Sequence, residues 1–149
     1  MPVQTIIGVN TLLGSASANP VPDIVALAAS ADPGIVDIPG ANGTGVFAVA
    51  TVNVGASSSI TATADTGGVS LPVSIALCQT NPQTSACLPP GPAASVTTQV
   101  NAGGTPTFGI FVTGSGVVPF DPANNRINLR FKDAGGVTRG STSEAVRTQ

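Results

Sequence analysis

Apolar and polar residues alternate with a period of two along most of this chain. The segment 58–65 shows this most clearly, because Ile60, Ala62 and Ala64 occupy every second position among Ser and Thr residues. Successive side chains of a β-strand point to opposite faces, so the pattern is typical of half-buried strands. We expect strands at residues 3–7, 23–29, 45–54, 58–65, 70–78, 95–101, 106–113, 125–132 and 137–147.

Turn-forming residues separate these segments. Gly, Pro, Asn and Asp gather at 32–34, 39–43, 66–68, 89–92, 102–104 and 133–136. Short strands joined by such turns predict an all-β fold, an antiparallel sandwich or barrel of about 7–9 strands. One alternative stays open at 23–29, where Pro22 followed by Asp23 also suits the start of a helix.

Three predicted strands carry more specific expectations. The first half of the segment 45–54 is apolar at both even and odd positions, so we expect a central strand that is covered on both faces. Alternation directs Phe108 and Phe131 into the core. Phe111 has the opposite parity to Phe108, so we expect it to face outward or into a second core.

The N-terminal stretch is set apart by the Gly-, Ser- and Ala-rich segment that follows it. Val3, Ile7, Val9 and Leu13 share one parity, as the apolar face of a strand would. Either this stretch is the first strand of its own domain, or it adds in trans to the sheet of another subunit. In the second case these four residues are the assembly residues.

Length and composition narrow the possible functions. The 149 residues predict one domain, and we assign 1–19 to an N-terminal strand or arm with its linker and 20–149 to a β-sandwich. With 8% charged residues and a net charge of −2, a nucleic-acid partner is not expected. The chain has no His, which excludes catalysis and metal binding by His. No apolar run reaches the length of a membrane span, so we expect no transmembrane segment.

Cys78 and Cys87 are the only two cysteines. Eight residues separate them, a spacing at which the two ends of a hairpin loop can come within disulfide distance. Two thiolates without a third Cys or a His cannot complete a zinc site. We therefore expect a disulfide and an extracellular, cell-surface or periplasmic location.

The best candidate for a metal site is a cluster of oxygen-bearing side chains before the strand 125–132. Asp121, Asn124 and Asn125 could supply calcium ligands at one tip of a sandwich, although an ordinary Asx-rich turn explains the same residues. Most of the other carboxylates also lie in or beside turns. We expect no catalytic residues, no enzymatic activity and no cofactor.

The basic residues are confined to the end of the chain. All five lie within 126–147, and Arg126, Arg130 and Lys132 share one face of a predicted strand. They are candidates for contact with an acidic partner, or else the solvated face of an edge hairpin.

The last two strands form the clearest predicted hairpin. Regular pairing would place Arg130 directly opposite Arg139, and like charges in that position are unfavourable. We therefore expect a β-bulge near Gly135 and Gly136 or near Gly140, or else partial separation of the two side chains.

The hairpin sequence 120–143, from Phe-Asp-Pro-Ala-Asn-Asn-Arg through Arg-Phe-Lys-Asp-Ala-Gly-Gly-Val-Thr-Arg-Gly-Ser-Thr-Ser, resembles the ends of secreted bacterial proteins of uncharacterised function. The segment 45–55 and the cysteine pair fit the same pattern, and the likeness covers about residues 20–147. It implies an immunoglobulin-like sandwich outside the cytoplasm. It implies no activity and no site residues.

These observations favour a non-catalytic extracellular module that is structural or adhesive. Its partners would be further copies of itself, in a surface filament joined by strand addition of the N-terminal stretch, or other surface proteins. The alternative is a ligand-binding module for glycan or calcium on a secreted bacterial protein, although a glycan site would have no Trp or Tyr to stack on the sugar.

Overall fold

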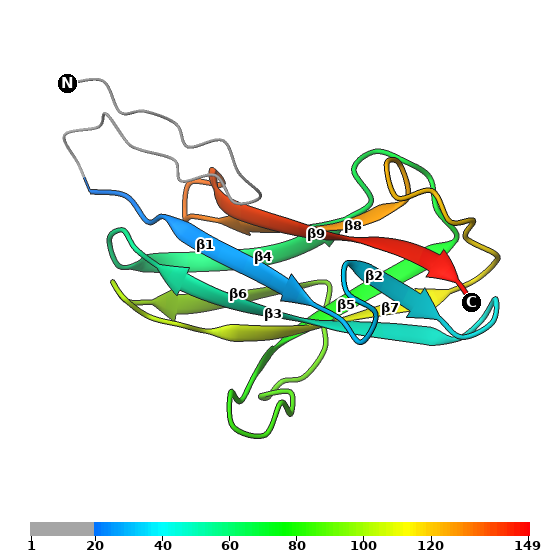
Figure 1. Cartoon of the computed structure of the whole chain (residues 1–149). Coiled ribbons are helices and arrows are strands. Elements are labelled where there is room, and N and C mark those ends of the chain that lie inside the picture. The colour runs from blue at the N-terminus through cyan, green and yellow to red at the C-terminus, as the bar shows by residue number, and fades with distance from the viewer. Residues whose placement is uncertain (1–19) are drawn as a thin grey trace.

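The structure, a computed structural model, describes residues 20–149 and is all-β in that part of the chain (Figure 1). It contains nine strands and no helix there. The strands are β1 (Ile24–Ala29), β2 (Ile35–Ile38), β3 (Thr44–Asn53), β4 (Ser58–Asp65), β5 (Val73–Thr80), β6 (Ser95–Val100), β7 (Thr107–Gly114), β8 (Arg126–Lys132) and β9 (Thr138–Thr148).

The strands form two sheets that enclose one core. The four-stranded sheet has the order β1-β3-β7-β5, and the five-stranded sheet has the order β2-β9-β8-β4-β6. All pairs are antiparallel except β2 with β9. The chain passes from one sheet to the other at every connection except the β8–β9 hairpin. No helix of membrane-spanning length and hydropathy occurs in the described residues.

The period-two pattern accounts for the core. Alternate residues of each sheet point inward, and the hydrophobic core cluster is aliphatic apart from Phe47, Phe108 and Phe131. The rings of Phe108 and Phe131 join the two sheets, with centroids 5.4 Å apart and planes tilted by 56°. The inward orientation predicted for these two residues is confirmed.

The two sheets approach closely along the side where β1 and β3 meet β9 and β2. A Cβ at Gly140 of β9 would overlap the carbonyl oxygen of Ile24 in β1. A Cβ at Gly45 of β3 would lie 2.7 Å from the carbonyl oxygen of Asp37 in β2. Glycine at these two positions lets backbones of opposite sheets pass next to each other. On the other side, β5 and β6 are the outermost strands of their sheets.

Two local expectations can be compared with the structure directly. Residues 24–29 form a strand, so the helix alternative is wrong. In the last hairpin, Phe131 pairs with Gly140 and Lys132 with Thr138, which leaves Arg139 out of register. The bulge predicted near Gly140 is confirmed.

Strand β2 was not expected from the sequence. It has four residues and lies between the turn sequences that contain Pro33 and Pro39. Its pairing with β9 joins segments more than one hundred residues apart, which no local pattern reveals. The strand expected at 3–7 lies outside the described residues.

Candidate functional site

The disulfide between Cys78 and Cys87 is confirmed, with Cα atoms 5.6 Å apart. It closes a loop that projects from the end of β5 (Figure 1). Within the loop, the amide of Asn81 donates to the carbonyl of Ala86 at 2.9 Å, and the amide of Ser85 donates to the carbonyl of Asn81 at 2.7 Å. The covalent link and these bonds hold the loop in a defined shape.

The outer face of the four-stranded sheet is uncharged, with apolar side chains beside a few Ser and Thr hydroxyls. The strand registers place its outward side chains in rows, one of which contains Ala29, Ala48, Gly109 and Cys78. The neighbouring rows are Leu27, Ala50, Thr107 and Thr80 on one side, and Val46, Phe111 and Ala76 on the other. In the middle row the two Ala residues are exposed and Gly109 and Cys78 are buried, so this row has the smallest side chains of the three.

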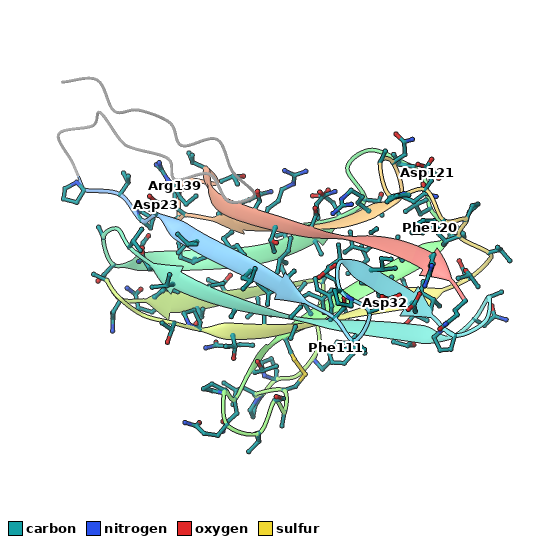
Figure 2. All side chains as sticks on the ribbon, in the orientation of Figure 1. Asp23, Asp32, Phe111, Phe120, Asp121 and Arg139 are labelled. Atoms are coloured by element: carbon teal, nitrogen blue, oxygen red, sulfur yellow. A yellow bond between two sulfur atoms is a disulfide. The ribbon has the colours of Figure 1, made fainter. Side chains whose placement is uncertain are left out.

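This outer face and the disulfide-closed loop together form a groove of about 350 Å³. Leu27, Val46 and Phe111 stand along it, and Pro82 and Ser85 of the loop form one wall. Figure 2 shows Phe111 on the side of the sheet from which the loop projects. The lining contains no charged residue and no Trp or Tyr. We call the whole surface, from Leu27 to the loop, the apolar face.

The expectation that the strand at 45–54 is covered on both faces is wrong. Strand β3 is central within its sheet, but only one of its faces is covered in the described chain. Phe47 and Val49 are buried, whereas Val46 is 53% exposed and Ala48 is exposed. Phe111 also faces outward, which was one of the two orientations predicted for it.

The candidate calcium residues form an internally bonded turn. The side-chain amide of Asn124 donates to a carboxylate oxygen of Asp121 at 3.0 Å, and the side-chain amide of Asn125 donates to the carbonyl of Pro119 at 3.1 Å. Both amides therefore present N–H groups to these oxygens. Among residues 20–149, no group of three or more His, Cys, Asp or Glu side chains gathers in a way that could hold a metal ion.

The three candidate contact residues of β8 lie on one strand, as predicted. Arg126 donates to the carbonyl of Pro122 at 2.8 Å and to the hydroxyl of Ser143 at 3.1 Å. Arg130 forms an ion pair of 2.7 Å with Asp65, which lowers the pKa of that carboxyl through the hydrogen bond. Lys132 lies half-exposed at the end of the strand.

Both arginines are thus held by their own chain. Their role in binding a partner stays a prediction.

A second charged cluster lies where β2 meets β9. Arg147 donates to Asp37 at 2.6 Å and to Asp32 at 3.0 Å, and its guanidinium lies 5.2 Å from the ring centre of Phe120. The hydrogen bond with Asp37 raises the pKa of Arg147. Figure 2 shows Phe120 and Asp32 at this end of the sandwich. The cluster fastens the unexpected parallel strand to the sheet.

One edge of the five-stranded sheet is open. In the described chain β6 pairs with β4 only, and its other edge faces away from that sheet. The strand contains no charged residue, no Pro and no bulge, which are the usual features that protect an edge from further pairing. The predicted assembly residues Val3, Ile7, Val9 and Leu13 lie outside the described residues.

Sequence reasoning missed the apolar face, although its signal was present. The apolar residues at both parities of 45–54 were interpreted as a strand buried on both sides. The loop that walls the groove is brought there by the pairing of β5 with β7, which the sequence does not specify.

We compared the chain with known proteins by sequence. No protein-family model matches it, and no curated protein shows significant similarity to it.

Proposed function

We propose that this protein is a non-catalytic structural module of an extracellular assembly. In this proposal, copies join when residues 3–13 of one chain add as a strand to the sheet of the next. The disulfide supports a location outside the reducing cytoplasm.

The strand order supports an immunoglobulin-like classification. In that fold, strands A, B, E and D form one sheet, and strands C, F and G form the other. If β2 and β6 are set aside, the remaining seven strands taken in chain order reproduce both sheets. Here β2 and β6 extend the second sheet at its two ends.

The observation that carries the proposal is the open edge of β6. Backbone N–H and C=O groups at such an edge are available to another strand, which gains a full ladder of hydrogen bonds. The core is also incompletely covered on this side, since Val73, Ile75 and Val96 are only partly buried. A strand added beside β6 would direct alternate side chains towards them.

The N-terminal stretch has the alternating apolar residues that a strand added beside β6 would need. Val3, Ile7, Val9 and Leu13 would occupy the inward positions of an added strand. Residues 14–20 contain no charged or bulky side chain, a composition typical of linkers that would let the strand reach a neighbouring copy.

Removal of the donor strand tests the proposal. The intact chain is expected to form assemblies much larger than a dimer, visible by electron microscopy and light scattering. Deletion of residues 1–14 is expected to abolish these large assemblies without loss of the β-sheet circular dichroism spectrum. An intact chain that forms no large assembly at high concentration would contradict the proposal, as would large assemblies that survive the deletion.

A pair of variants on β6 tests the acceptor edge. Thr98 pairs with buried Ile60 and faces inward, whereas its neighbour Gln99 is exposed on the outer face. Thr98→Lys leaves a charge that can extend to solvent in the free subunit but becomes buried when a strand is added. We expect Thr98→Lys to prevent large assemblies and the matched control Gln99→Lys to retain them. Equal behaviour of the two variants would count against this edge.

A further inference from the structure

One pair of adjacent residues in this chain can react with each other. Asn42 is followed by Gly43, and no other Asn of the sequence precedes a Gly. The side-chain amide carbon of an Asn can be attacked by the backbone nitrogen of the next residue. A following Gly has no Cβ to hinder that attack. The pair therefore places an electrophile beside an unhindered nucleophile.

The pair lies in the loop between β2 and β3, at the end of the sandwich where the chain ends (Figure 1). The side chain of Asn42 is exposed. The amide of Gly43 donates to the carbonyl of Gly40 at 3.4 Å, which is long for a hydrogen bond of this type. The attacking nitrogen is therefore only weakly held by another contact.

The two other exposed asparagines of residues 20–149 differ in this respect. The amide that follows Asn101 donates to the hydroxyl of Ser57 at 2.9 Å. The amide that follows Asn124 donates to the carbonyl of Asp121 at 2.7 Å. Both of these nitrogens are engaged in short hydrogen bonds, and both belong to residues that carry a Cβ.

The fold requires Gly at position 43. A Cβ at Gly43 would overlap the carbonyl oxygen of Pro39, at the other end of the same loop. Any larger residue would push these two parts of the loop apart. The packing of the loop therefore retains the residue that makes Asn42 reactive.

We propose that Asn42 deamidates spontaneously in the folded protein. The backbone nitrogen of Gly43 loses its proton to the solvent and forms a bond to Cγ of Asn42, and the side-chain nitrogen takes up a proton and leaves as ammonia. Water then opens the resulting succinimide ring at one of its two carbonyls. The product is aspartate or isoaspartate at position 42. This modification does not depend on the proposed function.

Both products change the charge of a region that has none. Residues 38–64 contain no charged residue, and one new carboxylate takes the formal net charge of the chain from −2 to −3. Isoaspartate also adds one carbon to the main chain. Because Gly43 is packed against Pro39, we expect this extra atom to lower the melting temperature by roughly 3–5 °C.

Incubation of the intact folded chain at neutral and mildly alkaline pH tests the proposal. Cleavage before Asp residues releases the peptide 37–64, in which fragment masses locate the modification and distinguish aspartate from isoaspartate. We expect deamidation at Asn42 to be about tenfold faster than at Asn101, because Gly43 lacks a Cβ. The rate should rise with pH, since the attacking nitrogen must lose its proton. Asn42→Gln should abolish the acidic form seen by isoelectric focusing.

Asn42→Asp is the matched control for the effect on the loop, because it carries the new charge without the extra main-chain atom. It is expected to melt like the parent chain, whereas material enriched in isoaspartate melts at lower temperature. The chain unfolded in urea provides the reference rate. If Asn42 stays intact in the folded protein while the unfolded chain deamidates there, the proposal is overturned, and equal rates at Asn42 and Asn101 in the folded protein would also overturn it.

Discussion

Glu144 is the one charged residue that is buried in the part of the chain that the structure describes, with 2% exposure. It pairs with core residue Ile127, so its side chain points into the sandwich, beneath Gly34. Its Oε2 atom has no hydrogen-bond partner. Burial raises the pKa of this carboxyl, and the positive charge of Arg126 opposes that shift only in part. The residue destabilises the fold when it is ionised.

Glu144→Gln is expected to stabilise the protein in a pH-dependent way. A raised folded-state pKa means that the wild type loses stability as pH rises from the unfolded pKa to the folded pKa. The variant lacks this loss, so it should match the wild type at about pH 4 or below and exceed it by about 1–3 kcal/mol at neutral pH. Urea unfolding at several pH values, followed by circular dichroism because Trp and Tyr are absent, measures the difference.

Asp65→Asn is the control with the opposite sign. The hydrogen bond from Arg130 lowers the pKa of Asp65, so its stabilising contribution is present at neutral pH and is lost as pH falls. Because this ion pair is largely exposed, the expected loss at neutral pH is below about 1 kcal/mol. If the free energies of unfolding of Glu144→Gln and the wild type differ by the same amount at every pH, this account of the buried carboxylate is contradicted.

At the scale of elements, β5 and β6 differ in whether another segment covers the free edge of the strand. The segment that follows the disulfide-closed loop bonds to β5, since Leu77 and Ala93 exchange two backbone hydrogen bonds and Leu88 donates to Gln79. Strand β6 has no such cover in the described chain. The proposed strand addition would therefore take place at β6 and not at β5. The disulfide was predictable from the cysteine spacing. The bonding of the segment after the loop to β5 was not, because it depends on the fold.

The disulfide is expected to stabilise both the fold and the groove wall. Cys78→Ser with Cys87→Ser should reduce the free energy of unfolding by about 2–3 kcal/mol, the chain-entropy value for a loop this short. Thermal melting and urea unfolding provide the measurements. A reductant should lower the melting temperature of the wild type and leave the double variant unchanged, and an equal response of both would contradict the prediction.

In the described chain, charged residues occur in strands β2, β4, β8 and β9 of the five-stranded sheet, whereas the four strands of the other sheet contain none. The proposed strand addition would use the edge of β6 and would join copies into chains. The charged β8–β9 hairpin, with Arg130 bonded to Asp65, would face solvent.

The sequence by itself determined eight of the nine described strands, most of their limits and the disulfide, and it indicated an irregularity in the last hairpin. These depend on local physics: the alternation of side chains, turn-forming residues, cysteine spacing and the repulsion of like charges. Only the tertiary structure decided that β2 joins β9, that Glu144 is buried and that Val46 and Phe111 share a face that no other described strand covers. Sheet order is set by contacts between segments distant in the chain. A hydrophobic period of two shows that a strand has two different faces, but it does not show what covers each face.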